Sequence, residues 1–455
     1  MALCLVFAVC GDKKRGKFSQ NAAACRFKDG GMYVILKKEE NKKGGEKMAE
    51  VTVTVPGYVT AVLKALSAAG YRGYLVGGSL RDILRGEEPH DYDLTTNATP
   101  EEMLAAFSAF RTIPTGLRHG TLTVLSDGQP VEVTTHRVDG AYADSRHPES
   151  VRFTTLLTED LSRRDFTVNA MAWSAETGLV DPFDGAGDLA AHVLRAVGTP
   201  EKRFEEDALR ILRLFRFAAQ LDFTIDPATA RGAAAMAAGL ARISAERVFG
   251  ELTRTLTGKA AQKGFLAMRQ CGCVPYVFGG AEPDFSLLPA FDRLPADPAV
   301  RLAALLAPQG EQTARALCRA LRTSNAFSHT VCGVIAAISD DLPRNEFEAR
   351  RFVCAHYETW RAALAVLAAK GENAENSAAL CETVTRDRTA VDLPRLAVKG
   401  AELQQKAGIR AEKTAKTLRY LQELVWREPQ QNKKAALLAA AREYAQREET
   451  EDERK

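Results

Sequence analysis

The stretch "YLVGGSLRDILRGEEPHDYDLTT", residues 74–96, constrains the fold of this chain more than any other. The apolar residues 74–76 predict a short strand, and Gly77 and Gly78 predict a turn directly after it. "SLRDILRG" predicts a helix with Ser79 as its N-cap, and the alternating "DYDLTT" predicts a second strand. Strands and a helix in so short a segment favour a mixed α/β domain.

The same stretch has the residue types of a nucleotide site beside a metal site. Glycines at the start of a helix let backbone N–H groups approach a phosphate, and Arg81 can neutralise the phosphate oxygens. Asp91 and Asp93 are expected on one side of their strand, because successive side chains alternate between faces. With Glu132 from the expected strand "VEVTT", these carboxylates are hard oxygen ligands suited to Mg²⁺. Taken singly, each element also fits a solvated strand edge or a surface arginine.

Several further motifs follow this stretch in order along the chain. "GGSLRDILRGEEPHDYD" resembles the G-G-x-x-R-D…D-x-D signature of the nucleotidyltransferase superfamily. More narrowly, it resembles class II tRNA nucleotidyltransferases (CCA-adding enzymes) and bacterial poly(A) polymerases. The resemblance covers roughly residues 70–260 and continues through "GLRHGTLTV", "VEVTTHRVDGAYADSRHPESVRF", "LSRRDFTVNAMAW", "DPFDGAGDL" and "RFEEDALRILRLFRFAAQL". It implies nucleotide contact by Arg164 and a hinge or anchoring role for Asp165.

The segment "EEDALRILRLFRF" carries two residues that are candidates for base recognition. Asp207 and Arg210 are three residues apart on one expected helix, where they can pair on neighbouring turns. Without the resemblance, an ordinary ion pair on the polar face explains them equally well. The resemblance implies that they are a protein template for the incoming base, with Arg213 and Arg216 near its sugar and phosphates.

Hydrogen-bonding chemistry is consistent with that template. An ionised aspartate only accepts hydrogen bonds and an arginine only donates them. Cytosine and adenine both present an amine beside a ring nitrogen acceptor, so both fit the pair. Uracil and guanine instead turn a carbonyl oxygen toward the carboxylate.

The predicted fold class is α+β, with a nucleotidyltransferase-type mixed-sheet head followed by an elongated, all-helical neck, body and tail. Strand and helix patterns alternate to about residue 195, and alanine- and leucine-rich helical patterns follow from Pro200. The expected divisions are a disordered leader or mis-assigned start (1–47), the head with the catalytic palm (48–195), a neck with the base-recognition helix (196–262), a body (263–350) and a tRNA-binding tail (351–455).

The tail "LAVKGAELQQKAGIRAEKTAKTLRYLQELVWREPQQNKKAALLAAA" resembles that of bacterial CCA-adding enzymes. Its basic residues form a candidate RNA surface, for which a solvated helical face is the alternative. They are Lys399, Lys406, Arg410, Lys413, Lys416 and Arg419.

Composition narrows the class of protein without identifying its partner. The chain is 46% hydrophobic and 26% charged with a net charge of +3, which is typical of a soluble protein and gives no strong nucleic-acid signal. No apolar run is long enough to span a bilayer, and the nine cysteines show no C-x-x-C pattern of a zinc site. We therefore expect a cytoplasmic protein without a membrane partner. The sequence leaves the oligomeric state open.

The resemblance implies template-independent addition of CCA to the 3′ end of tRNA from CTP and ATP, with release of pyrophosphate and two Mg²⁺ ions as cofactor. "VDGAYADSRHPESV", residues 138–151, resembles the flexible loop that full CCA-adding and A-adding enzymes carry and CC-adding enzymes lack. The acidic ending "EETEDERK" is unlike the basic extension usual in poly(A) polymerases of this family. A-adding, CC-adding and poly(A)-adding enzymes remain alternatives. A nucleotidyltransferase acting on a small molecule and a catalytically inactive RNA-binding protein are alternatives of other classes.

Overall fold

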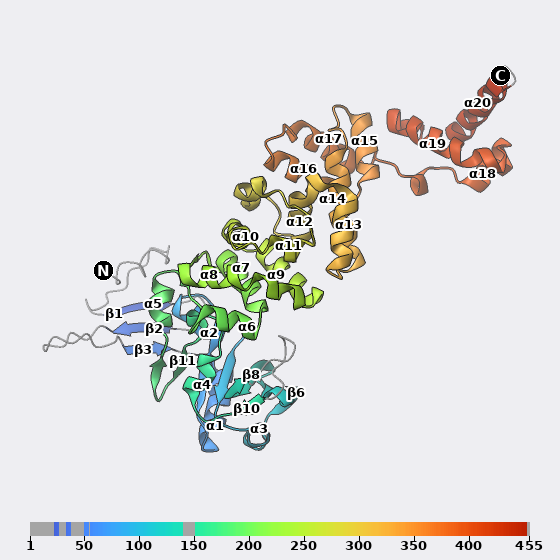
Figure 1. The fold of residues 1–455 in the computed structure, drawn as a ribbon. Helices are drawn as coiled ribbons and strands as arrows, with labels where there is room; N and C mark the ends of the chain where they lie inside the picture. The colour runs from blue at the N-terminus through green and yellow to red at the C-terminus, as the bar shows by residue number, and fades with distance from the viewer. Residues whose placement is uncertain (1–21, 27–32, 38–49, 54, 140–150, 453–455) are drawn as a thin grey trace. The chain divides into compact units, whose positions relative to one another are not determined.

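The computed structural model describes residues 22–26, 33–37, 50–53, 55–139 and 151–452 (Figure 1). By its contacts the chain divides into two units, Met1–Val277 and Phe278–Lys455. The predicted flexible loop of residues 138–151 lies almost entirely outside the described residues. The strands that flank it, β9 (Arg137–Asp139) and β10 (Val151–Phe153), pair antiparallel.

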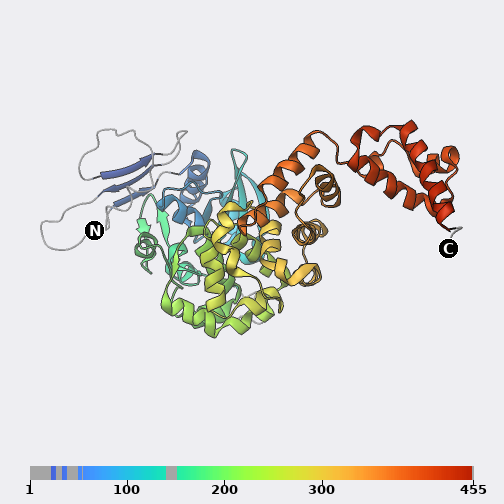
Figure 2. The same cartoon turned by 90° about the horizontal axis from the view of Figure 1, so that it is seen from above.

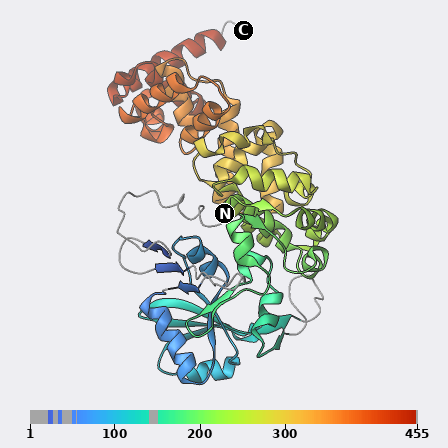
Figure 3. The same ribbon diagram turned by 90° about the vertical axis from the view of Figure 1, so that its left-hand side faces the viewer.

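A seven-stranded mixed sheet forms the centre of unit 1. In spatial order its strands are β12 (Gly178–Val180), β11 (Ala172–Ser174), β4 (Gly73–Val76), β5 (Asp93–Thr96), β8 (Gln129–Thr135), β7 (Thr121–Ser126) and β6 (Arg111–Gly116). The pair β5–β8 is parallel and the other neighbours are antiparallel. Figure 3 shows these strands side by side, with helices packed against them. The parallel pair places Asp93 opposite Glu132.

Helices α1 (Gly57–Ala68) and α3 (Pro100–Ala106) contact each other and the sheet. Helix α1 buries Val59, Val62 and Leu66. Helix α3 begins with a capping box, in which Thr99 accepts from the backbone N–H of Glu102 and the Glu102 side chain accepts from that of Thr99. A threonine before a proline at the first helical position is a local sequence signal for this helix start.

The remainder of unit 1 is mainly helical, with α7 at its centre. Its elements are α2 (Gly77–Leu84), η3 (Leu117–His119), α4 (Leu157–Ser162), η4 (Thr167–Asn169), α5 (Gly185–Ala190), β13 (Val193–Leu194), α6 (Pro200–Glu206), α7 (Leu209–Leu221), β14 (Thr224–Ile225), α8 (Pro227–Ala235), η5 (Ala237–Arg242), α9 (Ala245–Leu256), α10 (Ala261–Gln270) and α11 (Val274–Phe278), which ends at the boundary. Helix α7 packs against α9 and α10 in the green part of Figure 2. A Cβ on Gly264 of α10 would lie only 2.5 Å from the carbonyl oxygen of Phe215, so a glycine lets these helices approach.

Unit 2 is helical in its described residues. Its helices are α12 (Pro298–Leu306), α13 (Gly310–Ala320), α14 (Asn325–Ser339), α15 (Glu346–Ala355), α16 (Trp360–Ala369), α17 (Glu375–Arg386), α18 (Gly400–Ala407), α19 (Ala411–Arg427) and α20 (Lys434–Asp452). One apolar core gathers around Trp360, and a second gathers around Leu421. Among the described helices of both units, none is long and apolar enough to cross a membrane.

The structure differs from the predicted elements in two segments. Within residues 1–47, Ala22–Arg26 (β1) and Tyr33–Lys37 (β2) form strands in a sheet with Glu50–Val53 (β3), so the expected disorder is wrong for these residues. The β-branched and aromatic residues of "YVILK" favour such a strand. In the predicted all-helical neck, Thr224–Ile225 (β14) forms a short parallel pair with β13.

Candidate active site

Gly77 and Gly78 open helix α2 directly after β4, and we call this pair of glycines the cradle. Gly77 has a φ of +69°, which favours glycine because it has no Cβ. A Cβ on Gly77 would lie 3.2 Å from Nη1 of Arg164 and 3.6 Å from Oδ2 of Asp93. Helix α2 begins at Gly77 rather than after Ser79, and the Ser79 hydroxyl donates to the carbonyl of Val76 at 2.8 Å. The cradle therefore lies directly beside a cation and a carboxylate.

Asp91 and Glu132 act on the carboxylate of Asp93 next to this cradle. Asp93 is the first residue of β5, opposite Glu132 on β8. Burial, followed by repulsion from Asp91 and Glu132, raises the pKa of Asp93 to about 6, although Arg164 opposes this shift. Asp91 precedes the strand in a bend, so the strand alternation expected from sequence does not position it. Asp91 and Glu132 are nevertheless both close enough to Asp93 to raise its pKa.

This donor set fits a divalent cation that also binds a substrate. Asp91 and Glu132 repel the negative charge of Asp93, and a cation between these carboxylates would remove that repulsion. In the part of the chain that the structure describes, no group of three His, Cys, Asp or Glu side chains forms a metal site by itself. A bound cation would thus need other oxygen ligands, as Mg²⁺ takes from water and substrate phosphates.

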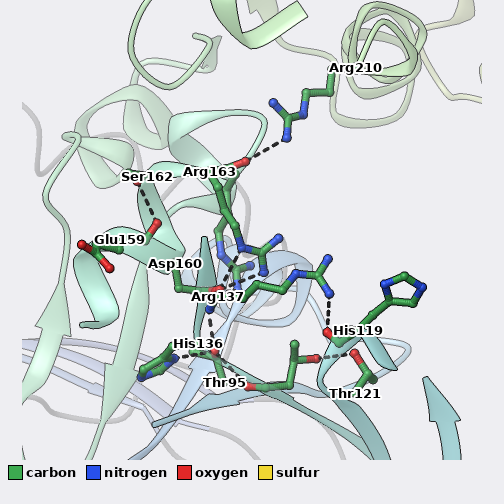
Figure 4. A network of polar contacts seen from close by, with 12 residues as sticks. Thr95, His119, Thr121, His136, Arg137, Glu159, Asp160, Ser162, Arg163 and Arg210 are labelled. Carbon is green, nitrogen blue, oxygen red and sulfur yellow. Dashed lines mark hydrogen bonds and ion pairs between the residues drawn. The ribbon is translucent and has the colours of Figure 1, made fainter. Parts of the chain in front are cut away.

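Asp160, a residue that the sequence analysis did not single out, binds both Arg163 and Arg164. Figure 4 labels Asp160 and Arg163. Its buried carboxylate accepts from Nη2 of Arg163 at 2.8 Å and from Nη2 of Arg164 at 3.2 Å. Burial would raise the pKa of Asp160, but the two arginines lower it to about 2. The spacing of an acid three and four residues before two arginines could have indicated this contact.

Arg81 points into a chain of hydrogen bonds that reaches α7. Its Nη1 donates to Oδ1 of Asn169 at 2.8 Å, and Nδ2 of Asn169 donates to Oδ1 of Asp165 at 3.1 Å. Oδ2 of Asp165 accepts from Nε of Arg213 at 2.7 Å. Burial would raise the pKa of Asp165, but Arg213 and the neighbouring donors hold it well below its usual range. Asp165 is thus arranged as an anchor between the glycine-turn helix and α7.

Asp207 and Arg210 do not lie on one helix as predicted, because the chain breaks between α6 and α7. Asp207 is extended, and its Oδ1 accepts from the N–H of Leu209 at 3.0 Å. Its Oδ2 accepts from Nη2 of Arg247, on α9, at 2.9 Å. The expected helical pairing of Asp207 with Arg210 is therefore wrong in its geometry.

Arg210 has its own set of partners. Its Nη1 donates to Oε2 of Glu206 at 2.5 Å, and its Nη2 donates to the carbonyl of Arg163 at 3.0 Å (Figure 4). The backbone N–H of Arg210 donates to the carbonyl of Asp207 at 3.0 Å, which keeps the two residues close. The contacts of Glu206 with Arg210 and of Arg247 with Asp207 were not predicted from the sequence. The first could have been, because Glu206 lies four residues before Arg210.

The other two predicted arginines of α7 differ in exposure. Arg213 forms an ion pair with Asp165 at 2.6 Å, and its side chain is 34% exposed. Arg216 forms an ion pair with Glu251 of α9 at 2.9 Å, and both side chains are below 10% exposed. Nucleotide contact by Arg216 would require this buried pair to open, whereas Arg213 already has an open side.

Comparison with known families places this geometry in context. Residues 73–195 match the family model described as the poly A polymerase head domain. Residues 222–286 match the model described as a probable RNA and SrmB-binding site of polymerase A. The first match contains the cradle and the three carboxylates, and it ends before α7.

Individual relatives give a more specific assignment. A CCA-adding enzyme of Lactobacillus gasseri is 38% identical over 291 residues, which are 62% of this chain and 73% of that protein. One of Limosilactobacillus fermentum is 46% identical over 207 residues, 46% of this chain and 51% of that protein. The crystal structure of the Bacillus stearothermophilus CCA-adding enzyme in complex with CTP matches with a TM-score of 0.75 and 30% identity, covering 87% of this chain and 98% of that one. The chain belongs to the family of CCA-adding enzymes.

Proposed function

We propose that this chain adds CCA to the 3′ end of tRNA, using CTP and ATP and releasing pyrophosphate. The observation that carries the proposal is the contact geometry at Gly77, where a cradle for phosphate meets Arg164 and Asp93. Family membership supports it, and the similar B. stearothermophilus structure is a complex with CTP. Since its substrate is tRNA, we propose that the chain acts in the cytoplasm.

The reaction is a nucleotidyl transfer. The 3′-hydroxyl of the RNA attacks the α-phosphorus of the nucleotide, a new phosphodiester forms, and pyrophosphate leaves. The N–H groups of Gly77 and Gly78 and the guanidiniums of Arg81 and Arg164 bind the triphosphate. Little covalent chemistry by the protein is required, so positioning and charge neutralisation carry the rate.

Asp91 and Asp93 would hold two Mg²⁺ ions, with Glu132 as the third carboxylate beside them. When bound, the ions would activate the attacking hydroxyl and neutralise charge on the leaving oxygens. The parallel pairing of β5 with β8 holds Asp93 opposite Glu132 before substrate binds, and this proximity contributes to the raised pKa of Asp93. Binding of a nucleotide with its cations would relieve the repulsion among them.

Base choice is assigned to Asp207 and Arg210. The Asp207 carboxylate accepts a hydrogen bond from the exocyclic amine of cytosine or adenine, and Arg210 donates to the neighbouring ring nitrogen. Arg247 and Glu206 orient the two groups before the base arrives. By analogy with paired contacts to bases in DNA, correct pairing contributes about 1–3 kcal/mol of discrimination.

The adjacent residues Arg163 and Arg164 link the two halves of the site. The carbonyl of Arg163 accepts from Arg210, and the guanidinium of Arg164 lies beside Asp93 and the Gly77 turn. Consecutive Cα atoms are about 3.8 Å apart, so the base-reading group and the phosphate-binding group are fixed to the same short piece of backbone. This supports one nucleotide bridging both.

The domain assignments accompany this function as proposals. The catalytic head at 48–195 supplies the cradle and the acids, and the neck at 196–262 supplies base recognition. The body at 263–350 connects them to the tail at 351–455, which binds tRNA. The nucleotide site lies within unit 1, and the proposed tail lies within unit 2.

Product length on a defined RNA tests the function against its alternatives. A tRNA ending at the discriminator base and one ending in CC are each incubated with CTP, with ATP, and with both. An Asp93→Ala variant prepared in parallel controls for contaminating activity. We expect two added nucleotides with CTP alone and three with both. A stop after two residues with both substrates indicates a CC-adding enzyme, and addition only to a tRNA ending in CC indicates an A-adding enzyme. Long tails from ATP alone indicate a poly(A) polymerase, and no product from the unmodified protein contradicts the proposal.

A further inference from the structure

Three arginine side chains converge on the ring of Phe217, in α7. The guanidinium carbon of Arg216 lies 4.2 Å from the ring centroid, and those of Arg81 and Arg213 each lie 5.3 Å from it. Cations within about 6 Å of an aromatic face are attracted by its quadrupole. The ring thus contacts one arginine from the glycine-turn helix α2 and two from the base-recognition helix α7.

The ring itself is held firmly. Phe217 is 6% exposed, and Phe166 packs edge-on against it with ring centroids 5.8 Å apart. Arg216, the closest cation, is fixed in turn by its buried ion pair with Glu251. These contacts leave Phe217 little freedom to move when a ligand binds.

Each arginine also has a polar partner that holds its guanidinium. Arg81 binds Asp82 and Asn169, and Arg213 binds Asp165. Three guanidiniums around one ring, each with a carboxylate partner, are more than neutral core packing requires. The side chain of Arg213 is 34% exposed, so it can also donate to an anion with several charges, such as a triphosphate.

We propose that Phe217 is a positioning residue for the nucleotide, whose ring fixes the guanidiniums of Arg81 and Arg213 for contact with the triphosphate. The inference rests on the proposed function for the identity of the ligand. In this proposal the buried ring of Phe217 sets the spacing between α2, which binds phosphate, and α7, which carries Arg210 and Arg213. A residue that only fills the core would change stability and leave phosphate affinity unaltered.

Matched substitutions of two neighbouring phenylalanines separate these roles. Phe217→Leu removes the ring that contacts the three arginines. Phe166→Leu is the control, because it removes the neighbouring buried ring that packs edge-on against Phe217. Phe217→Tyr keeps the aromatic face. Calorimetry measures the binding of CTP, ATP and inorganic tripolyphosphate to each folded variant, and steady-state assays give KM and kcat.

We expect Phe217→Leu to weaken all three ligands by about tenfold, equivalent to about 1.4 kcal/mol. Tripolyphosphate is included because it has no base, so its loss of affinity reports the phosphate contacts alone. Phe166→Leu and Phe217→Tyr should keep affinities close to those of the unmodified protein. Equal losses in Phe217→Leu and Phe166→Leu, or unchanged tripolyphosphate binding in Phe217→Leu, would overturn the proposal.

Two further arrangements keep the test decisive. If Phe217→Leu does not fold, Phe217→Met fills similar space without an aromatic face and takes its place. If the unmodified protein adds no nucleotides to tRNA, the proposed function fails, and the tripolyphosphate comparison still decides the role of Phe217.

Discussion

A Gly77→Ala variant tests whether the geometry of the site affects catalysis independently of folding stability. Gly77 has a left-handed φ of +69°, which costs a residue with a Cβ about 1–2 kcal/mol. The new Cβ would lie 3.2 Å from Nη1 of Arg164, closer than an ordinary contact. Arg164 cannot yield freely, because its Nη2 is held by Asp160 at 3.2 Å. The guanidinium must therefore shift away from the phosphate cradle.

Gly70→Ala is the matched control for this change. Gly70 also has a left-handed φ, +86°, but a Cβ there would have no heavy atom within 4 Å. Both variants should lose about 1–2 kcal/mol of folding free energy, which lowers Tm by about 2–4 °C per kcal/mol in a unit of this size. Only Gly77→Ala should lose catalysis, by about ten- to a hundredfold in kcat/KM, because small displacements of positioning groups are costly.

The assay is single-nucleotide addition of CMP to tRNA lacking CCA, with thermal unfolding measured on the same preparations. Equal kcat/KM in Gly77→Ala and Gly70→Ala would refute the reasoning. It would show that the cradle tolerates a methyl group and that Arg164 does not need its present position.

Three further predictions follow from the site. Burial opposes ionisation of Asp160, but Arg164 and Arg163 lower its pKa from 3.8 to about 2, so its contribution to stability is complete above about pH 4 and is lost as the pH falls toward 2. Urea denaturation should show that Asp160→Asn has a lower free energy of unfolding than the unmodified protein, by roughly 2–3 kcal/mol at neutral pH. This difference should become smaller below pH 4, and a difference that stays constant would contradict the prediction. Asp207→Ala should relax base choice by about tenfold or more in a four-nucleotide competition, and unchanged selectivity would remove the template role. Asp93→Ala should abolish incorporation and leave tRNA affinity within about twofold in filter binding, since the role proposed for Asp93 is to hold the cations and not to bind tRNA. Retained incorporation would exclude a metal role.

Much of the site could be predicted because its chemistry follows local patterns. The two glycines after a strand and the acid that opens the next strand lie in one short stretch of sequence, so Gly77 and Asp93 stand out without long-range information. The contact of Glu132 with Asp93 needed only the expectation that their strands are neighbours, which the parallel pairing confirms. The capping box at Thr99 is likewise a local signal.

The features that could not be predicted from the sequence depend on tertiary contacts, or on a helix break that no glycine or proline marks. "EEDALR" contains neither glycine nor proline, so it reads as continuous helix, yet the chain is extended at Asp207. That break is stabilised by Arg247, which lies 40 residues away on another helix. The burial of Arg216 against Glu251 has the same origin. Such partners cannot be paired from one sequence, because several packings bring α9 near α7.

A structure of the chain with CTP and Mn²⁺ tests the central claim most directly, since anomalous scattering locates the metal independently of the nucleotide. The account predicts Mn²⁺ on Asp91 and Asp93, bound also to the phosphates of the same CTP whose amine donates to Asp207. A metal elsewhere, or a cytosine that lies away from Asp207 and Arg210 while its phosphates occupy the cradle, would contradict it.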